Sequence, residues 1–542
     1  MSANSNLDAV LTEVGEFGLF QVITYMLICI PSALSATYVV NYMVSANTLI
    51  YRCKIPECDV GENSREIAYD QPWLRNAIPT IENSNGKMEN CVRYASLDRN
   101  SSTESSLAKC GPDMFNKSLI VKCSEFIYAT DERNVQTELN IHCADSYKLA
   151  LVGTVNNIGR FVFLPLNGLL SDKYGRLTVV IIGMTCGSLF GLIKSFSTNY
   201  LMYICLEFFE SMGTSCFAGM YVLALEWVNS RKRVLGSVIV AISFPVGEIL
   251  LGLVAMYVHD FRTVIRILYT PGLFLVVYFY IVPESVRWLL VSGRVERAIQ
   301  ILKRTARVNG KTLSDKSIEM IKMTYKPNPS DGETTESNSI AQSLKSIFKS
   351  KVLFFRFLNN CYQWMNCCFC YYGLSLIATQ LPGENRYTSF IFVVAIEIPG
   401  LLIALPLLNR INRRILLFGA LSVTAFSTIV TSLIPAENST VILLLFMLGK
   451  CTITLAFNSL YVFTAEQWPT NVRTTIINAC SMIGRIGSML APSIVLLAQH
   501  GSLPSILFGA SAILAAFLVL LCPETFSKKL PDTVEEAKAL RL

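Results

Sequence analysis

Among the ionisable residues inside the long apolar runs of this chain, we single out seven that could carry substrate chemistry. They are Arg160, Glu207, Glu210, Glu248, Glu397, Lys450 and Arg485. A charge at the centre of a bilayer costs about 2.5–3.5 kcal/mol or more, so such residues usually bind a ligand or pair with one another. Arginine binds a carboxylate through two parallel hydrogen bonds, and a glutamate can meet an ammonium group. The mixture of signs predicts a site for a small organic ion, with a packing pair as the alternative at each position.

Aromatic residues accompany these charges. Trp364 and Tyr371 are seven residues apart in one run, which places them on one helix face, and Tyr372 follows. Aromatic faces attract ammonium groups, although an aromatic belt at the membrane interface has the same composition. We expect the substrate-binding residues to be Arg485, Lys450, Trp364, Tyr371, Tyr372, Glu397, Glu207 and Glu248.

The elements that position these residues must be membrane-spanning helices. The chain of 542 residues is 52% hydrophobic and only 16% charged, whereas soluble proteins carry about 25% charged residues. A spanning helix needs roughly 20 mostly apolar residues. Twelve such runs lie near residues 20–42, 149–169, 178–197, 200–224, 234–256, 264–282, 352–377, 388–408, 415–435, 441–464, 475–498 and 503–522. The sequence therefore predicts an all-α membrane protein embedded in a lipid bilayer.

Charge sets the expected topology. The polar segment 283–351 is rich in lysine and arginine and divides the spans six and six, so the positive-inside rule places it in the cytoplasm with both termini. We expect a cytoplasmic N-terminus (1–16), an N-terminal six-helix half (17–282), a cytoplasmic linker (283–351), a C-terminal six-helix half (352–522) and a cytoplasmic tail (523–542). The start of the chain lacks the pattern of a cleaved signal peptide.

Segment 51–147 must then lie outside the cell. It contains six cysteines, Cys53, Cys58, Cys91, Cys110, Cys123 and Cys143, and two glycosylation sequons, at Asn100 and Asn116. Six cysteines in an exported segment predict three disulfides, for which fifteen connectivities are open. A zinc site is the weaker alternative, because neither a paired CxxC spacing nor a histidine cluster accompanies these cysteines.

The two halves repeat one another. Pro283-Glu284-Ser285 ends the sixth run, and Pro523-Glu524-Thr525 ends the twelfth, 240 positions later. Glu226 and Glu466 end the fourth and tenth runs at the same offset. Parallel repeats of six helices are the build of major facilitator transporters, in which the halves rock around a central site.

The stretch GLLSDKYGRL at 168–177 lies in the hairpin between the second and third runs. Charges at such a rim can pair when an inner gate is shut and separate when it opens, because such pairs have a modest net energy. A plain topology marker is the alternative. We expect the gating residues to be Asp172, Arg176, Glu226, Arg233, Glu284, Arg287, Glu466 and Arg473.

The whole chain resembles the organic cation, organic anion and carnitine transporter family of the major facilitator superfamily. The resemblance rests on GEFGLFQ at 15–21, the cysteine-bearing segment, GLLSDKYGRL, PESVRWLLVSGRVERA at 283–298, WMNCCFCYYGLSL at 364–376, VAIEIPG at 394–400, AEQWPTNVR at 465–473 and GRIGSMLAP at 484–492. It implies a plasma-membrane transporter that carries an organic cation or a carnitine-like zwitterion by alternating access. The motive force would be a gradient of the substrate, of Na⁺ or of H⁺, or the membrane potential, so Na⁺ and H⁺ are candidate co-transported ions.

The resemblance also bears on Arg485. Many cation carriers of the family are acidic at the corresponding place, whereas anion and carnitine-type carriers have arginine there. An organic anion carrier is therefore one alternative, and a transporter-like receptor without net flux is another; a channel is the third. Asn412, where a glycine is usual in the second hairpin, and the acidic residues of span 4 depart from the family pattern.

Other classes of protein fit the sequence poorly. Only three histidines are present, and the chain contains neither a GxSxG elbow nor a P-loop, so we expect no enzyme, no cofactor and no resident metal. The net charge of +7 comes without a basic arm that has interleaved aromatics, so we expect no nucleic-acid partner.

Overall fold

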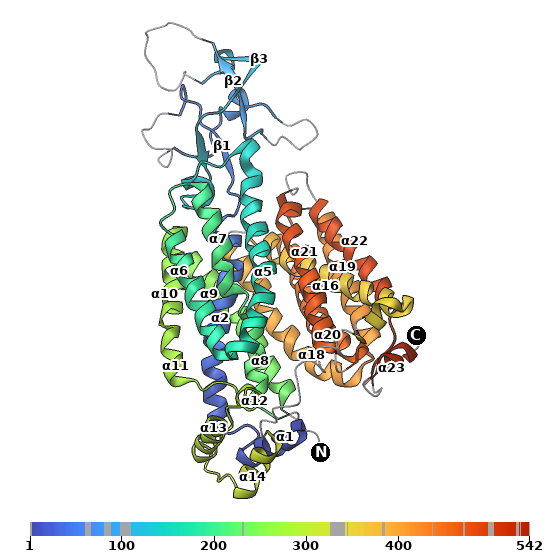
Figure 1. Cartoon of the computed structure of the whole chain (residues 1–542). Helices are drawn as coiled ribbons and strands as arrows, with labels where there is room; N and C mark the ends of the chain where they lie inside the picture. Colours follow the sequence, from blue (N-terminus) through green and yellow to red (C-terminus); the bar gives the residue numbers. More distant parts are fainter. Residues whose placement is uncertain are drawn as a thin grey trace. The chain divides into compact units, whose positions relative to one another are not determined.

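The structure is a computed structural model of the chain (Figure 1). It describes residues 3–59, 67–80, 88–97, 110–229, 232–325, 342–343, 345–381, 385–435, 437–469, 472–496, 503–526, 531 and 533–540. The chain divides into two compact units. Unit 1 comprises residues 1–44, 150–258 and 262–542, and unit 2 comprises residues 45–149 and 259–261.

Unit 1 is a helical bundle made of two groups of helices. The N-terminal group contains α2 (Leu19–Ser45), α5 (Tyr147–Tyr174), α6 (Arg176–Lys194), α7 (Tyr200–Thr214), α8 (Phe217–Glu226), α9 (Arg233–Tyr257), α10 (Phe261–Leu273), η3 (Phe274–Val277) and α11 (Tyr278–Ile281). The C-terminal group contains α16 (Lys351–Ala378), α17 (Arg386–Ala395), α18 (Glu397–Arg410), α19 (Arg413–Leu433), α20 (Ser439–Gln467), α21 (Arg473–Leu496) and α22 (Leu503–Val519).

Each of the twelve predicted runs is occupied by one helix or by two or three consecutive ones. In the described part of the chain, ten helical segments are long and apolar enough to cross a membrane, and α22 is a shorter apolar helix. Predicted runs 200–224 and 388–408 are each split into two helices, α7–α8 and α17–α18. The predicted class, an all-α membrane protein of two six-helix halves, is confirmed.

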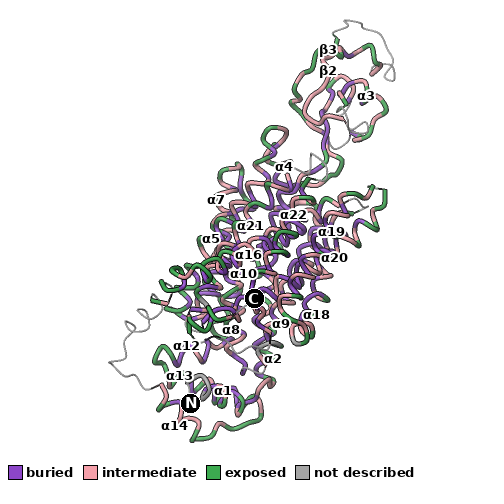
Figure 2. The backbone as a smooth tube through the Cα atoms, turned by 90° about the vertical axis from the view of Figure 1, so that its right-hand side faces the viewer, coloured by how far each residue is buried: buried purple, intermediate pink, exposed green. Residues whose placement is uncertain are grey.

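The helices expose apolar side chains on their outer faces. Leu169, Phe274, Tyr280, Leu433 and Leu521 are all more than half exposed. Figure 2 colours the exposed residues of the chain green and the buried ones purple. A surface of this composition is stable against lipid tails and unfavourable in water. Several charged residues of the apolar runs, among them Arg160, Glu207 and Lys450, are instead buried between helices, where they can form a site.

Short helices lie at one end of the bundle. Helix α1 (Ala3–Val14) packs against α13 (Val295–Val308) and α14 (Asp315–Thr324), and α12 (Val286–Val291) leads into them; α23 (Val534–Ala539) packs on α16. We call this end of the bundle, where α12, α13 and α14 of the linker lie, the linker side. The opposite helix ends, where α2 ends and α5 begins, are the loop side.

Unit 2 is a small domain with two antiparallel strand pairs. β1 (Tyr51–Cys53) pairs with β4 (Phe126–Tyr128), and β2 (Val92–Ser96) pairs with β3 (Phe115–Lys122). Short helices α3 (Leu74–Ala77), η1 (Pro112–Met114), α4 (Val135–Glu138) and η2 (Cys143–Ser146) complete it. Its core consists of Cys53, Ile55, Leu74, Ala77, Ile78 and Phe115.

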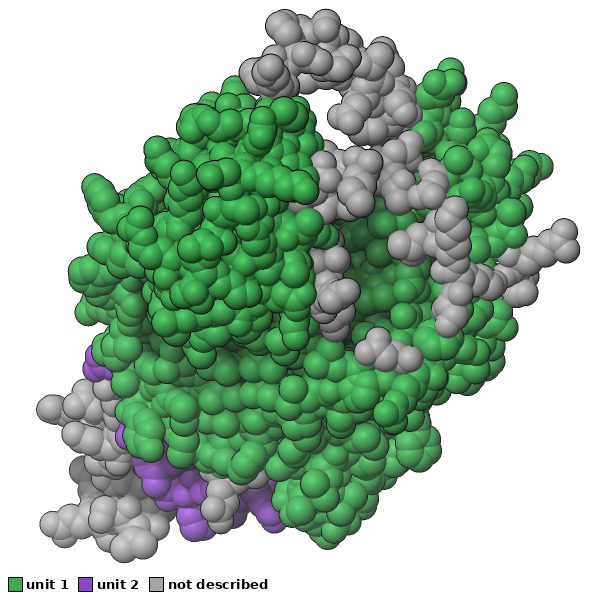
Figure 3. Space-filling model, turned by 90° about the horizontal axis from the view of Figure 1, so that it is seen from below, with its two compact units in different colours: residues 1–44, 150–258, 262–542 green, residues 45–149, 259–261 purple. Residues whose placement is uncertain are grey.

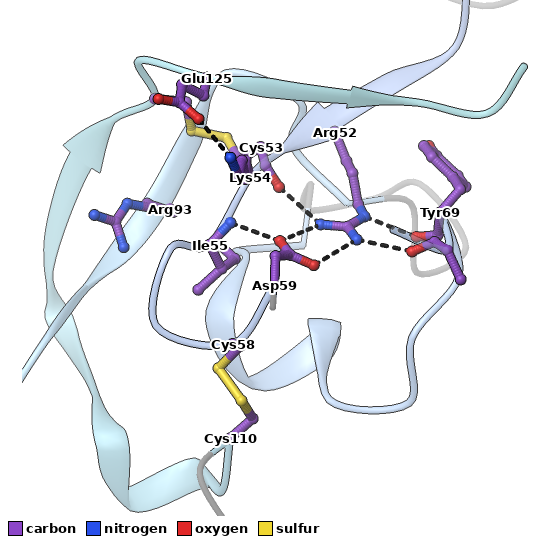
Figure 4. Close-up of polar contacts among 12 residues, drawn as sticks. Arg52, Cys53, Lys54, Ile55, Cys58, Asp59, Tyr69, Arg93, Cys110 and Glu125 are labelled. Atoms are coloured by element: carbon purple, nitrogen blue, oxygen red, sulfur yellow. Dashed lines mark hydrogen bonds and ion pairs between the residues drawn. A yellow bond between two sulfur atoms is a disulfide. The ribbon is translucent and has the colours of Figure 1, made fainter. Parts of the chain in front are cut away.

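Three disulfides and one buried ion pair hold unit 2 together. The bonds join Cys53 to Cys123, Cys58 to Cys110, and Cys91 to Cys143. Arg52 binds both carboxylate oxygens of Asp59 at 2.9 Å and donates to the carbonyl oxygen of Tyr69 at 2.7 Å (Figure 4). A core this small cannot stabilise a fold alone, so covalent cross-links supply much of its stability.

Of the two predicted glycosylation sequons, Asn100 lies outside the described residues. Asn116 lies on β3, partly exposed, and its side chain accepts a hydrogen bond from the backbone amide of Ser118 at 3.0 Å. Glycosylation at this position stays a prediction.

Candidate functional site

Two arginines from opposite halves meet at one tyrosine. Arg160 on α5 donates to the hydroxyl oxygen of Tyr372 on α16 at 3.1 Å, and Arg485 on α21 donates to the same oxygen at 3.4 Å. Among the described residues neither guanidinium group has a carboxylate partner, and the Nε atom of each is buried without a hydrogen-bond partner. Buried cations without a counter-charge are costly, so the pair forms a natural site for an anionic group.

Close helix packing positions Arg485. It lies in the sequence Gly484-Arg485-Ile486-Gly487, and α21 packs extensively along α16. A Cβ atom at Gly487 would lie 2.1 Å from the carbonyl oxygen of Met365, so a larger residue would push the two helices apart. Small residues let helices approach closely in membranes, and here they bring the guanidinium group to Tyr372.

Aromatic rings adjoin the arginine pair. Trp364 is fully buried, donates from Nε1 to Thr464 at 3.0 Å, and lies edge-on to Tyr461 with ring centroids 4.5 Å apart. Phe457 packs between Trp364 and Tyr371, with ring centroids at 5.8 and 6.0 Å. Because Trp364 and Tyr371 are covered, Tyr461, at 37% exposure, presents the accessible ring. Sequence reasoning missed Phe457 and Tyr461, although their spacing of four on one helix face could have indicated them.

A second polar cluster surrounds Lys450 on α20. Its ammonium group lies 2.9 Å from Glu397, donates to Ser375 at 2.6 Å, and lies 3.3 Å from the ring centroid of Tyr371. The Tyr371 hydroxyl in turn donates to Glu397 at 2.7 Å. Lys450 and Glu397 thus neutralise each other in this conformation. Glu248, on α9 of the other half, is fully buried and interacts electrostatically with both.

A third polar cluster is internal to the N-terminal half. Lys194 at the end of α6 pairs with Glu207 at 2.6 Å and with Glu210, and all three side chains are fully buried. Asn156 donates to Glu207 at 2.9 Å, and the Tyr269 hydroxyl donates to Glu210. In this conformation the predicted substrate-binding residue Glu207 is occupied by protein partners. Sequence reasoning missed Lys194, which lies near the end of its apolar run.

At the linker side, the two Pro-Glu motifs adopt the same geometry. Glu284 accepts from the backbone amides of Leu177 and Thr178 at 3.0 and 3.3 Å and so caps the start of α6. Glu524 accepts from the amides of Arg413 and Arg414 at 3.0 and 3.1 Å and so caps α19. Carboxylates are favourable at helix N-termini, where amide groups lack partners.

The hairpin glycine has a specific role in the first motif. Gly175 has a φ of +111°, and a Cβ atom there would lie 2.3 Å from Glu284. Glycine is therefore needed both for the backbone conformation and for the approach of the carboxylate. Asn412 has a φ of −55° in the second hairpin, so the two hairpins differ in backbone conformation at the motif.

Several of the predicted gating charges form ion pairs at the linker side. Arg176 binds Asp172 and lies 3.6 Å from Glu226. Arg287 binds Asp8 at 2.5 Å, and Arg413 lies 3.3 Å from Glu466. Arg473 donates to the carbonyl oxygen of Trp468 at 3.4 Å, whereas the side chain of Arg233 lies outside the described residues.

Contacts between the halves gather at the loop side. Thr154 on α5 donates to the carbonyl oxygen of Met489 on α21 at 3.1 Å, and α9 packs against α17 and α18. The linker-side face of unit 1, in contrast, has a hollow (Figure 3). Closure at one end and a hollow at the other are the features expected of one state of a rocking two-half carrier.

Comparisons with known proteins agree with this geometry. The model of the Major Facilitator Superfamily matches residues 123–492. The inward-open xylose transporter XylE from E. coli superposes with a TM-score of 0.56 at 16% identity, covering 75% of this chain and 93% of that one, which shows the fold.

Relatives match over nearly the whole length. The chain is 30% identical to the organic cation transporter protein of Drosophila melanogaster (98% of this chain, 94% of the relative). It is 31% identical to the organic cation transporter-like protein of the same fly (98% and 92%), and 29% identical to solute carrier family 22 member 4 of Mus musculus (98% and 95%). The chain therefore belongs to the organic cation transporter family of the major facilitator superfamily and is a multi-pass membrane transporter of small organic solutes.

Proposed function

We propose that the substrate is a small organic cation that also bears a carboxylate, that is, a carnitine-like zwitterion. The observation that carries this proposal is the pair Arg160 and Arg485, which converge on Tyr372 without a carboxylate partner among the described residues. The carboxylate of the substrate binds between the two guanidinium groups. Its ammonium group lies on the aromatic side, against the exposed ring of Tyr461.

The relatives' names support the cationic end of this substrate. Two of them are called organic cation transporter protein and organic cation transporter-like protein, whereas two buried arginines would repel a plain cation. A zwitterion reconciles the two observations. An organic anion carrier is the second candidate, and the same arginine pair favours it, because an anion needs no partner for an ammonium group.

Transport proceeds by alternating access of this site. The halves are in contact at the loop side and leave a hollow at the linker side, so rocking would expose the arginine pair to one compartment at a time. Gating uses the rim charges Asp172, Arg176, Glu226, Glu284, Arg287, Glu466 and Arg473, which exchange partners as the linker side closes.

Charge and the cysteines support one orientation in the membrane. The linker and both termini face the cytoplasm of a plasma-membrane protein, while unit 2 with its disulfides faces outward, where disulfides persist. A companion cation, Na⁺ or H⁺, crosses with the substrate.

Uptake into proteoliposomes tests the substrate class. We expect the purified chain to accumulate radiolabelled L-carnitine faster than tetraethylammonium or benzoate. Faster uptake of tetraethylammonium would refute the proposed role of the arginines, and faster uptake of benzoate would establish the anion carrier instead. Binding of all three without accumulation would indicate a receptor.

A further inference from the structure

One carboxylate at the boundary between the halves has no donor. Glu248 on α9 is fully buried, and neither of its carboxylate oxygens has a hydrogen-bond partner among the described residues. An ionised carboxylate in such a place would lose its hydration without compensation. Binding one proton avoids this cost, because the neutral carboxyl group carries no charge and can donate a hydrogen bond.

The neighbour that could accept this bond comes from the other half. Glu397 on α18 acts electrostatically on Glu248, and α9 packs against α18. Glu397 already receives the Lys450 ammonium group at 2.9 Å and the Tyr371 hydroxyl at 2.7 Å. The cluster thus holds two carboxyl groups and one ammonium group, so one negative charge is left over unless a proton is bound.

In the described part of the chain, the groups of α2 and α17 that contact this part of α9 at its glycines are uncharged. On the α2 side, a Cβ atom at Gly247 would lie 2.0 Å from the carbonyl oxygen of Ala33, which shows how closely the helices approach. One turn further on, Ile391 and Phe390 of α17 pack against Gly252. The titratable and charged groups that act on Glu248 are therefore Glu397, Lys450 and Tyr371.

We propose that Glu248 is a proton-binding site that couples protonation to closure of the loop side. When the halves part at the loop side, Glu248 separates from Glu397 and its carboxylate meets water. Uptake of one proton converts –COO⁻ to –COOH, which removes the repulsion between the two carboxylates and lets the carboxyl group donate to Glu397. The proton leaves towards the chamber through Glu397 and the Tyr371 hydroxyl. This inference rests on the proposed alternating access, and it assigns H⁺ as the companion ion.

Infrared difference spectroscopy tests the site without any substrate. We expect the full-length protein in detergent at neutral pH to show the C=O stretching band of a buried protonated carboxyl group, and Glu248→Gln to lose that band. The amide of the variant keeps a donor towards Glu397, so folding should be preserved. A band that persists in Glu248→Gln, or a wild type without the band, would overturn the assignment.

Transport tests the coupling. In proteoliposomes, an inward proton gradient should raise L-carnitine uptake several-fold in the wild type and leave Glu248→Gln unaffected. Ser243→Ala on the same helix, where Ser243 bonds Ser32 at 2.5 Å, is the matched control and should keep the proton dependence. If a Na⁺ gradient but no proton gradient drives uptake in the wild type, and Glu248→Gln loses this dependence, the coupled ion is Na⁺ and the proposal is refuted. Because the infrared band needs no transport, an absence of L-carnitine uptake would count against the substrate only.

Discussion

The strongest prediction concerns Arg485→Ala. The Arg485 side chain donates one long bond, 3.4 Å, to Tyr372, and its Nε atom has no partner among the described residues, so its removal breaks little within the protein. The loss should therefore fall on the substrate. A hydrogen bond to a charged group contributes about 1.5–3 kcal/mol. At 1.4 kcal/mol per factor of ten, the KM for L-carnitine should rise about 10- to 150-fold.

A series at the same position sharpens this expectation. Arg485→Lys keeps the positive charge but loses the planar guanidinium group that can bind a carboxylate through two parallel hydrogen bonds. The KM of this variant for L-carnitine should therefore lie between those of the wild type and Arg485→Ala. Arg485→Asp should abolish uptake of carboxylate-bearing solutes or shift the preference to tetraethylammonium. Arg410→Ala, at the exposed linker end of α18, is the control and should leave the KM unchanged.

The assay is the initial rate of radiolabelled uptake into proteoliposomes, normalised to the amount of reconstituted protein. An unchanged KM for L-carnitine in both Arg485→Ala and Arg485→Asp would refute the role given to the arginine pair.

Four further predictions concern stability and gating. Lys194→Met leaves two buried carboxylates unpaired and should cost about 3–5 kcal/mol, seen as a lower Tm; an unchanged Tm would contradict the ion triad. Glu284→Ala and Glu524→Ala should each cost about 1–2 kcal/mol, and the effects should add in the double variant, because the two caps lie in different halves. Asp172→Asn should lower transport sharply while surface expression persists; a loss of expression instead would make Asp172 a folding determinant. Burial lowers the pKa of His142, so the unfolded chain binds a proton at His142 more readily than the folded unit 2. The free energy of unfolding of unit 2 should therefore be highest above pH 6.5, the ordinary pKa, and fall as the pH decreases below it. Protection factors for amide hydrogen exchange in unit 2 that stay constant from pH 7 to 5 would contradict this.

The fold could be predicted because hydrophobic runs and repeated end motifs are local signals. Twelve apolar runs indicated the helices, and the offset of 240 between Glu284 and Glu524 indicated the repeat. The structure adds the physical reason for that repeat, since each glutamate caps a helix that begins about 110 residues earlier, after the hairpin of the same half. A spacing along the chain could not show that these carboxylates accept backbone hydrogen bonds.

The candidate site was predictable only in part. Arg160 and Arg485 stood out as charges inside apolar runs, but their meeting at Tyr372 depends on how the two halves pack. The ion-pair partners of Lys194 were not predictable either, because they lie on the next helix. The disulfide pairing was also open, since six cysteines allow fifteen connectivities and only the fold selects one. Contacts between distant segments leave no pattern in one sequence.

Counterflow tests the central claim, a single arginine site that opens to each side in turn, most directly. Proteoliposomes loaded with unlabelled L-carnitine are diluted into a trace of labelled L-carnitine, and the label inside is followed over time. An alternating site predicts that the label rises transiently above its outside concentration and then falls. Label that never exceeds the outside concentration, despite measurable uptake, would contradict the account.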